Sequence, residues 1–241
     1  MPNRHEIDKD GDLMLHLSGM CLGDGDGDGD GDCAEGEDVD EKLAKYEKVA
    51  NDELRVSSKV LVLASPVFKA MLDGNFKEAT ELVKNTGFTN PYSIDLPSDD
   101  VEAMITLCQI LHFYVVERPE PSGLSKLAFI SDKYECTQAL NYCGRVWISD
   151  WLQEYDKNMP PMVGFCHLLV FSYVVDLPIE FSEISWRIFL HHEGPFLSNS
   201  DQVKLLADHP LLRHDIIRGH RQENFSTLMK KLIFKFLLRK P

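Results

Sequence analysis

The stretch from Leu54 to Leu72, LRVSSKVLVLASPVFKAML, restricts the fold more than any other part of the chain. Its first residues alternate between apolar and polar as in a strand, and Ser57-Ser58 can then cap a helix. The chain restarts at Ser65-Pro66, because serine favours the N-cap and proline costs nothing at the first helical position. The pattern predicts a strand and two short helices around one core. The residues expected to build this unit are Leu54, Val56, Val60, Leu61, Ser65, Pro66, Phe68 and Leu72.

Further strands and helices are predicted on both sides of this stretch. Gly11 to Leu17 alternates with the period of a half-buried strand. Asp99, with Glu102 three residues later, predicts a capped helix start. The stretch from Asp73 to Asn90 carries glycine and asparagine breakers and is expected to be a connector. The other expected elements are a strand at Tyr92–Leu96 and helices at Asp99–His112, Ser122–Tyr134 and Asn141–Tyr155.

Together these segments resemble the BTB/POZ domain, in the form common in filamentous fungi. Leu54–Leu72 is similar to the family's signature, and GDLMLHL at 11–17 is similar to its first strand. Residues 92–112 resemble the third strand and the helix after it, and 127–140, with DKYEC at 132–136, resembles the closing helices. Four segments in the right order are more specific than one short motif. The resemblance implies an α+β fold, a short mixed sheet with helical hairpins.

The predicted domain organisation has three parts. Residues 1–10 are expected to be a polar N-terminal tail, too short to supply the helix through which animal transcription factors of this family dimerise. The resemblance implies that residues 11–150 form a BTB/POZ domain, and residues 151–241 are expected to form an all-helical C-terminal extension. Apolar faces in the extension recur at 162–175, 179–190, 200–207 and 211–238. The stripe in the last of these consists of Phe225, Leu228, Met229, Leu232, Ile233, Phe236 and Leu237.

An acidic low-complexity insertion is predicted at residues 19–50, where aspartate alternates with glycine from Asp24 to Asp32. Such a segment has nothing to bury and repels itself, so it is expected to be disordered. The alternative is an EF-hand calcium loop, since Asp24, Asp26, Asp28, Gly29 and Glu35 match its pattern. The same pattern recurs two residues later, as an alternating repeat must produce, and helical flanks are missing. We expect an acidic loop with weak, nonspecific cation binding.

Charge and cysteine content narrow the class of protein. The net charge is −14, and residues 1–53 hold 17 acidic against 5 basic residues, which argues against general nucleic-acid binding. The six cysteines form no C-x-x-C pair, so reduced thiols in the cytoplasm or nucleus are expected. No apolar run approaches the roughly 20 residues that cross a bilayer, so no membrane partner is expected.

No enzyme signature is found in the chain. His191-His192-Glu193 lacks the i, i+4 histidine spacing of a zinc site. Cys166 and His167 are adjacent, so on a helix they point about 100° apart and make a poor catalytic pair. The sequence therefore predicts a noncatalytic protein without a cofactor or metal.

The resemblance implies a protein–protein interaction module, often a homodimer and in many members a substrate adaptor for cullin-based ubiquitin ligases. Those adaptors carry a hydrophobic-x-Glu motif, which falls here on Phe76-Lys77-Glu78. Phe76 would fill an apolar pocket of the cullin scaffold and Glu78 would add a polar contact at its rim. Alternatively, Phe76 packs under its own loop. The other function left open is a self-association scaffold or transcription-associated cofactor with no ligase role.

The C-terminal segment is basic, with 8 basic against 2 acidic residues over 212–241. Cations near the end of a helix stabilise its dipole, which is one reason for this composition. The other is a basic helix that binds an anionic membrane or nucleic acid. The residues concerned are Lys230, Lys231, Lys235, Arg239 and Lys240.

Overall fold

The computed structural model describes residues 3–19, 50–85, 90–158 and 162–191. The Gly-Asp repeat with its EF-hand alternative, and the helices predicted at 200–207 and 211–238, lie outside these residues.

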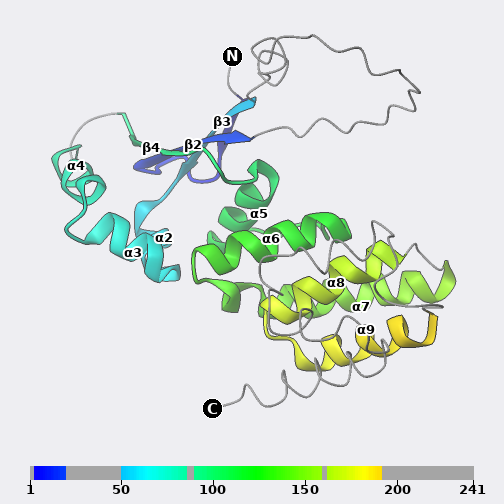
Figure 1. The fold of residues 1–241 in the computed structure, drawn as a ribbon. Helices are drawn as coiled ribbons and strands as arrows, with labels where there is room; N and C mark the ends of the chain where they lie inside the picture. Colours follow the sequence, from blue (N-terminus) through cyan, green and yellow to red (C-terminus); the bar gives the residue numbers. More distant parts are fainter. Residues whose placement is uncertain (1–2, 20–49, 86–89, 159–161, 192–241) are drawn as a thin grey trace, which may run out of the picture.

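A four-stranded mixed sheet forms one end of the molecule (Figure 1). Its strands are β1 (Asn3–Glu6), β2 (Leu13–Gly19), β3 (Ala50–Val56) and β4 (Tyr92–Leu96), in the order β1-β3-β2-β4. β2 and β3 are antiparallel, whereas β1 runs parallel to β3 and β4 parallel to β2. The predicted mixed α+β class is confirmed.

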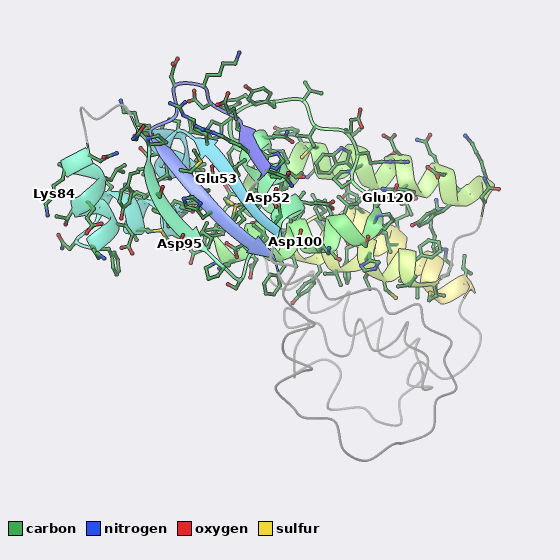
Figure 2. The ribbon with its side chains drawn as sticks, turned by 90° about the horizontal axis from the view of Figure 1, so that it is seen from above. Asp52, Glu53, Lys84, Asp95, Asp100 and Glu120 are labelled. Carbon is green, nitrogen blue, oxygen red and sulfur yellow. The ribbon has the colours of Figure 1, made fainter. Side chains whose placement is uncertain are left out.

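The sheet buries one face, as the alternating sequence predicts. Leu15 of β2 lies opposite Leu54 of β3 and Ile94 of β4, and all three are buried. Most alternate positions carry polar side chains, including Glu53 and Asp95, which Figure 2 shows from above, whereas Met14 of β2 is an apolar and buried exception. The helices therefore cover the leucine-rich face.

Strand β1 corrects the prediction that residues 1–10 are a tail. Its residues are polar and carry no strand pattern, but their backbone pairs with β3 from Asn3↔Asp52 to Glu6↔Arg55. Ile7, which follows the strand, is buried, and its N–H donates to the Arg55 carbonyl at 3.0 Å. Pairing with a neighbouring strand, rather than local sequence, makes this strand.

The helical hairpin predicted after β3 is present as α2 (Ser58–Ala64) and α3 (Pro66–Asp73). Ser65 caps α3 as predicted, and its Oγ accepts from the Phe68 N–H at 3.1 Å. At α2 neither serine hydroxyl caps the helix. The Asp12 carboxylate does so, accepting from the Ser58 N–H at 2.8 Å and from the Ser58 hydroxyl at 2.6 Å.

The remaining helices follow the predicted order, with two corrections. The expected connector at Asp73–Asn90 contains a helix, and the N-cap of the helix after β4 is Asp100 rather than Asp99, since Asp100 Oδ1 accepts from the Ala103 N–H at 3.0 Å. The elements are α4 (Lys77–Asn85), α5 (Val101–Leu111), α6 (Pro121–Lys133), the 3₁₀ helix η1 (Thr137–Leu140), α7 (Asn141–Lys157), α8 (Met162–Val174) and α9 (Pro178–His191).

One continuous hydrophobic cluster joins the sheet to the last described helices. Phe68 stacks on Tyr134 with ring centroids 4.3 Å apart, which links α3 to the end of α6. Residue 150, the predicted domain boundary, lies within α7, and α8 packs against α6. Of the predicted signature residues, Leu54, Val56, Leu61, Ser65, Phe68 and Leu72 are buried, Val60 is half-buried and Pro66 is exposed.

Among the helices of residues 58–85, 101–157 and 162–191, none combines the length and the apolar character needed to cross a membrane.

Candidate protein-interaction surface

The corner between α3 and α4 holds the predicted contact residues Phe76 and Glu78, and it is closely packed at its start. Gly74 ends α3, and a Cβ at this position would lie 2.2 Å from the Ala70 carbonyl oxygen. Any other residue would therefore force the backbone to shift. Three residues later α4 begins at Lys77, and this helix lies beside β4 at one end of the molecule (Figure 1).

Phe76 is exposed, with 60% of its surface accessible. Its backbone is nevertheless fixed, because its carbonyl accepts from the Thr80 N–H and the Thr80 hydroxyl, each at 3.3 Å. The side chain therefore projects from an anchored position and does not pack under its own loop, which was the alternative left open by the sequence.

Glu78 lies in the first turn of α4, where the helix dipole favours a negative charge. It is half-buried and three residues before Glu81, so the two share one side of the helix. That side faces β4, because the Tyr92 hydroxyl donates to Glu81 Oε2 at 3.2 Å. Two positions on a helix are about 200° apart, so the structure does not place Phe76 and Glu78 on one face.

The electrostatics of Tyr92 agree with this placement of Glu78. Partial burial, followed by the hydrogen bond to Glu81 and the charges of Glu81 and Glu78, raises the pKa of the Tyr92 phenol. Lys77 Nζ lies 3.9 Å from Glu81 Oε1 and balances part of this charge. The side of α4 that carries Glu78 and Glu81 thus faces the sheet and contacts it through Tyr92.

The outward side of α4 carries a second exposed apolar residue that the sequence prediction missed. Val83 is 71% exposed and follows Phe76 by seven residues, so both lie on one stripe with Thr80 between them. Lys84, labelled in Figure 2, follows Thr80 by four residues and therefore borders this stripe near the C-terminal end of α4. The i, i+7 spacing of Phe76 and Val83 was present in the sequence, but it was hidden by the expectation of a connector. We call Phe76, Thr80 and Val83 the α4 stripe.

A groove of about 650 Å³ lies between α5, residues 115–120 and the start of α6. Its lining mixes charges of both signs, and its cations are engaged. Lys126 pairs with Asp100 at 3.0 Å, and Arg118 pairs with Glu154 at 2.7 Å while lying over the Trp151 ring. No nucleophile paired with a base lines this groove.

Ser125 and Cys166 are two nucleophilic side chains of the described helices, and both make contacts within the fold. The Ser125 Oγ atom lies 2.8 Å from the Ser122 carbonyl oxygen, to which it donates, and 2.9 Å from His167 Nδ1. Burial raises the pKa of the Cys166 thiol to about 12, so it is not a reactive thiolate. Within the part of the chain that the structure describes, His, Cys, Asp and Glu residues form no group of three or more that could hold a metal.

Comparison with models of known protein families and with curated proteins gives no match to this chain.

Proposed function

We propose that this chain is a BTB/POZ-type protein that acts as a noncatalytic interaction module, with the α4 stripe as its docking surface for a cullin scaffold. The support is the sequence signature at Leu54–Leu72 together with the strand and helical hairpin that it forms. The observation that carries the proposal is the exposure of Phe76 on a fixed backbone, at the place of the adaptor motif.

Energetics favour Phe76 as the main contact. Burying a phenylalanine side chain in a partner pocket contributes about 1.5–3 kcal/mol, which corresponds to roughly a 10- to 100-fold change in affinity. Its fixed backbone lowers the entropy lost on binding. Glu78 contributes less, because it is half-buried and faces away from Phe76.

The test is the affinity of the full chain for a purified cullin, measured by calorimetry. Phe76→Ala is expected to weaken binding at least tenfold, and Glu78→Ala less than threefold. Phe113→Ala is the matched control, because Phe113 is 93% exposed and outside α4, and it should leave the affinity unchanged. Equal affinities for the wild type and Phe76→Ala, or no binding of the wild type, would reject the adaptor proposal.

The alternative is a self-association scaffold, which the outer edge of β1 favours. β1 is an edge strand whose partner on its inner side is β3, and edge strands are templates for pairing with another chain. Light scattering across a dilution series separates the two functions. A stable dimer without cullin binding supports the scaffold, whereas a monomer that binds cullin supports the adaptor.

A further inference from the structure

Helix α9 carries solvent-exposed apolar side chains at the opposite end of the molecule from α4 (Figure 1). Ile179, Trp186 and Leu190 are 72%, 59% and 56% exposed, and their spacing of i, i+7 and i+11 places them on one side of the helix. A single exposed apolar residue needs no explanation, but three along one helix side indicate a surface that packs against something.

A groove of about 190 Å³ between α7 and α9 borders this stripe, and its lining includes three carboxylates (Asp156, Glu180 and Glu183) and two arginines (Arg145 and Arg187). Arg187 donates to both Asp156 and Glu183, so this cation is already shared by two acids. Glu180 is left in a different position. Its Oε1 lies 4.0 Å from Arg145 Nε, at the limit of an ion pair, and its Oε2 is buried without a hydrogen-bond partner among the described residues.

A buried carboxylate oxygen with no hydrogen-bond partner among the described residues can accept a bond from a donor that enters the groove. A lysine or arginine that enters the groove would supply that donor. The ligand that fits this end of the molecule therefore combines an apolar stripe, to cover α9, with basic residues beside it.

The chain itself contains a segment of this composition. Residues 225–237 carry apolar residues at helical spacing, and Lys230, Lys231 and Lys235 lie between them. We propose that this C-terminal segment docks along α9, with one of its basic side chains donating to Glu180. The docking gives the basic composition a third role, distinct from dipole stabilisation and from membrane or nucleic-acid binding.

Lengths and connectivity agree with docking within one chain. A 13-residue helix is about 20 Å long, and the 14-residue α9 is about 21 Å long. Residues 192–224 connect α9 to the segment and can span about 100 Å when extended, so either direction of packing is open to it. A tethered segment also has a high effective concentration, which favours it over a second copy in dilute solution.

The test is site-specific photo-crosslinking in the full chain, with p-benzoylphenylalanine in place of Ile179. Irradiation is expected to join position 179 to residues 225–240 of the same chain, as mapped by peptide mass spectrometry on the monomer band. The same probe in place of Val83, which is exposed on α4 at the other end of the molecule, is the control and should not reach that segment.

Charge reversal tests the role of Glu180. Changing Lys230, Lys231 and Lys235 together to glutamate is expected to lower the crosslink yield at least fivefold, and adding Glu180→Lys and Glu183→Lys should restore part of it. A product that joins two chains would assign the surface to a second copy and overturn the proposal. The proposal would also be overturned by the absence of a crosslink, or by a crosslink yield that the charge changes leave unaltered. In either case, binding of the segment to phosphatidylserine vesicles would favour the membrane interpretation.

Discussion

At the scale of single residues, Asp99 explains how the DKYEC segment is joined to the rest of the fold. Its side chain is almost completely buried, and its carboxylate accepts from Lys133 Nζ and, at 2.5 Å, from the Tyr134 hydroxyl. Tyr134 in turn stacks on Phe68, and its carbonyl accepts from the Ser65 hydroxyl. The polar contacts of this cluster therefore connect the start of α5, the end of α6 and the cap of α3.

Removing either side of the Asp99–Tyr134 contact is expected to destabilise the protein. Tyr134→Phe should lower the free energy of unfolding by about 1–2 kcal/mol, the usual loss for a buried hydrogen bond to a charged group. Asp99→Ala should cost about 3 kcal/mol, because it also leaves Lys133 without its partner. Urea unfolding measures both.

The double variant distinguishes a coupled cluster from two independent changes. The combined loss should be smaller than the sum of the single losses by about 1 kcal/mol, since both changes remove the same contact. Tyr142→Phe is the control, because Tyr142 is 88% exposed, and it should shift stability by less than about 0.5 kcal/mol. Strictly additive losses would show that Asp99 and Tyr134 do not act together.

Helix caps and side-chain hydrogen bonds could be predicted from the sequence where the two bonded residues are close in the chain, and not where they are distant. Ser65 and Pro66 start a helix through contacts within three residues, and the structure has that helix start. Asp99 was expected to be an N-cap, but its partners are 34 and 35 positions away and the neighbouring Asp100 caps instead. Asp12, which caps α2 from 46 positions away, carried no local signal at all.

At the scale of helices and strands, close packing decides which glycines are needed. Gly144 in α7 faces Phe171 of α8, and a Cβ there would lie 2.8 Å from the Phe171 Cε1 atom. Phe171 is fully buried, so it has no room to move aside. Gly123 in α6 differs, because the nearest atom to its Cβ position is Pro119 Cβ at an ordinary 3.5 Å.

The two glycines should therefore respond in opposite ways to alanine. Gly123→Ala is expected to stabilise the protein by about 0.5–1 kcal/mol, because alanine loses less backbone entropy in a helix. Gly144→Ala gains the same propensity but overpacks the α7–α8 contact, so a net loss of about 1–2 kcal/mol is expected. Thermal unfolding of the two variants side by side checks this, and a stabilised Gly144→Ala would mean that α8 can shift.

The elements that the sequence missed are those that depend on their neighbours. β1 is polar and short, and it becomes a strand because β3 offers an edge. α4 is bounded by glycine and asparagine, which predict a connector, but Ala79 is buried and Glu81 binds Tyr92 on β4. The functional consequence is the α4 stripe, of which Phe76 was predicted and Val83 was not.

At the scale of the whole molecule, the described helices and the sheet share one core, so unfolding should expose the buried cysteines and tyrosines together. Burial raises the pKa of the Cys136 and Cys166 thiols from 9.0 to about 12. It also raises the pKa of Tyr155 to about 12, and there the charges of Glu120 and Glu154 add to the effect. These groups all hold their protons more tightly in the folded chain.

A folded-state pKa above the unfolded value gives stability that is complete below the unfolded pKa and is lost as pH rises toward the folded one. The free energy of unfolding should therefore be constant with respect to these thiols below pH 9 and fall between about pH 9 and 12, by about 1.4 kcal/mol per pH unit for each. Urea unfolding under reducing conditions at pH 8 and pH 10 measures the fall in the free energy of unfolding.

Cys166→Ala should lower stability at both pH values but reduce the difference between them, because one of the titrating groups is gone. An unchanged difference would mean that Cys166 ionises equally in the folded and unfolded chain, which would contradict its burial between α8 and the rest of the core.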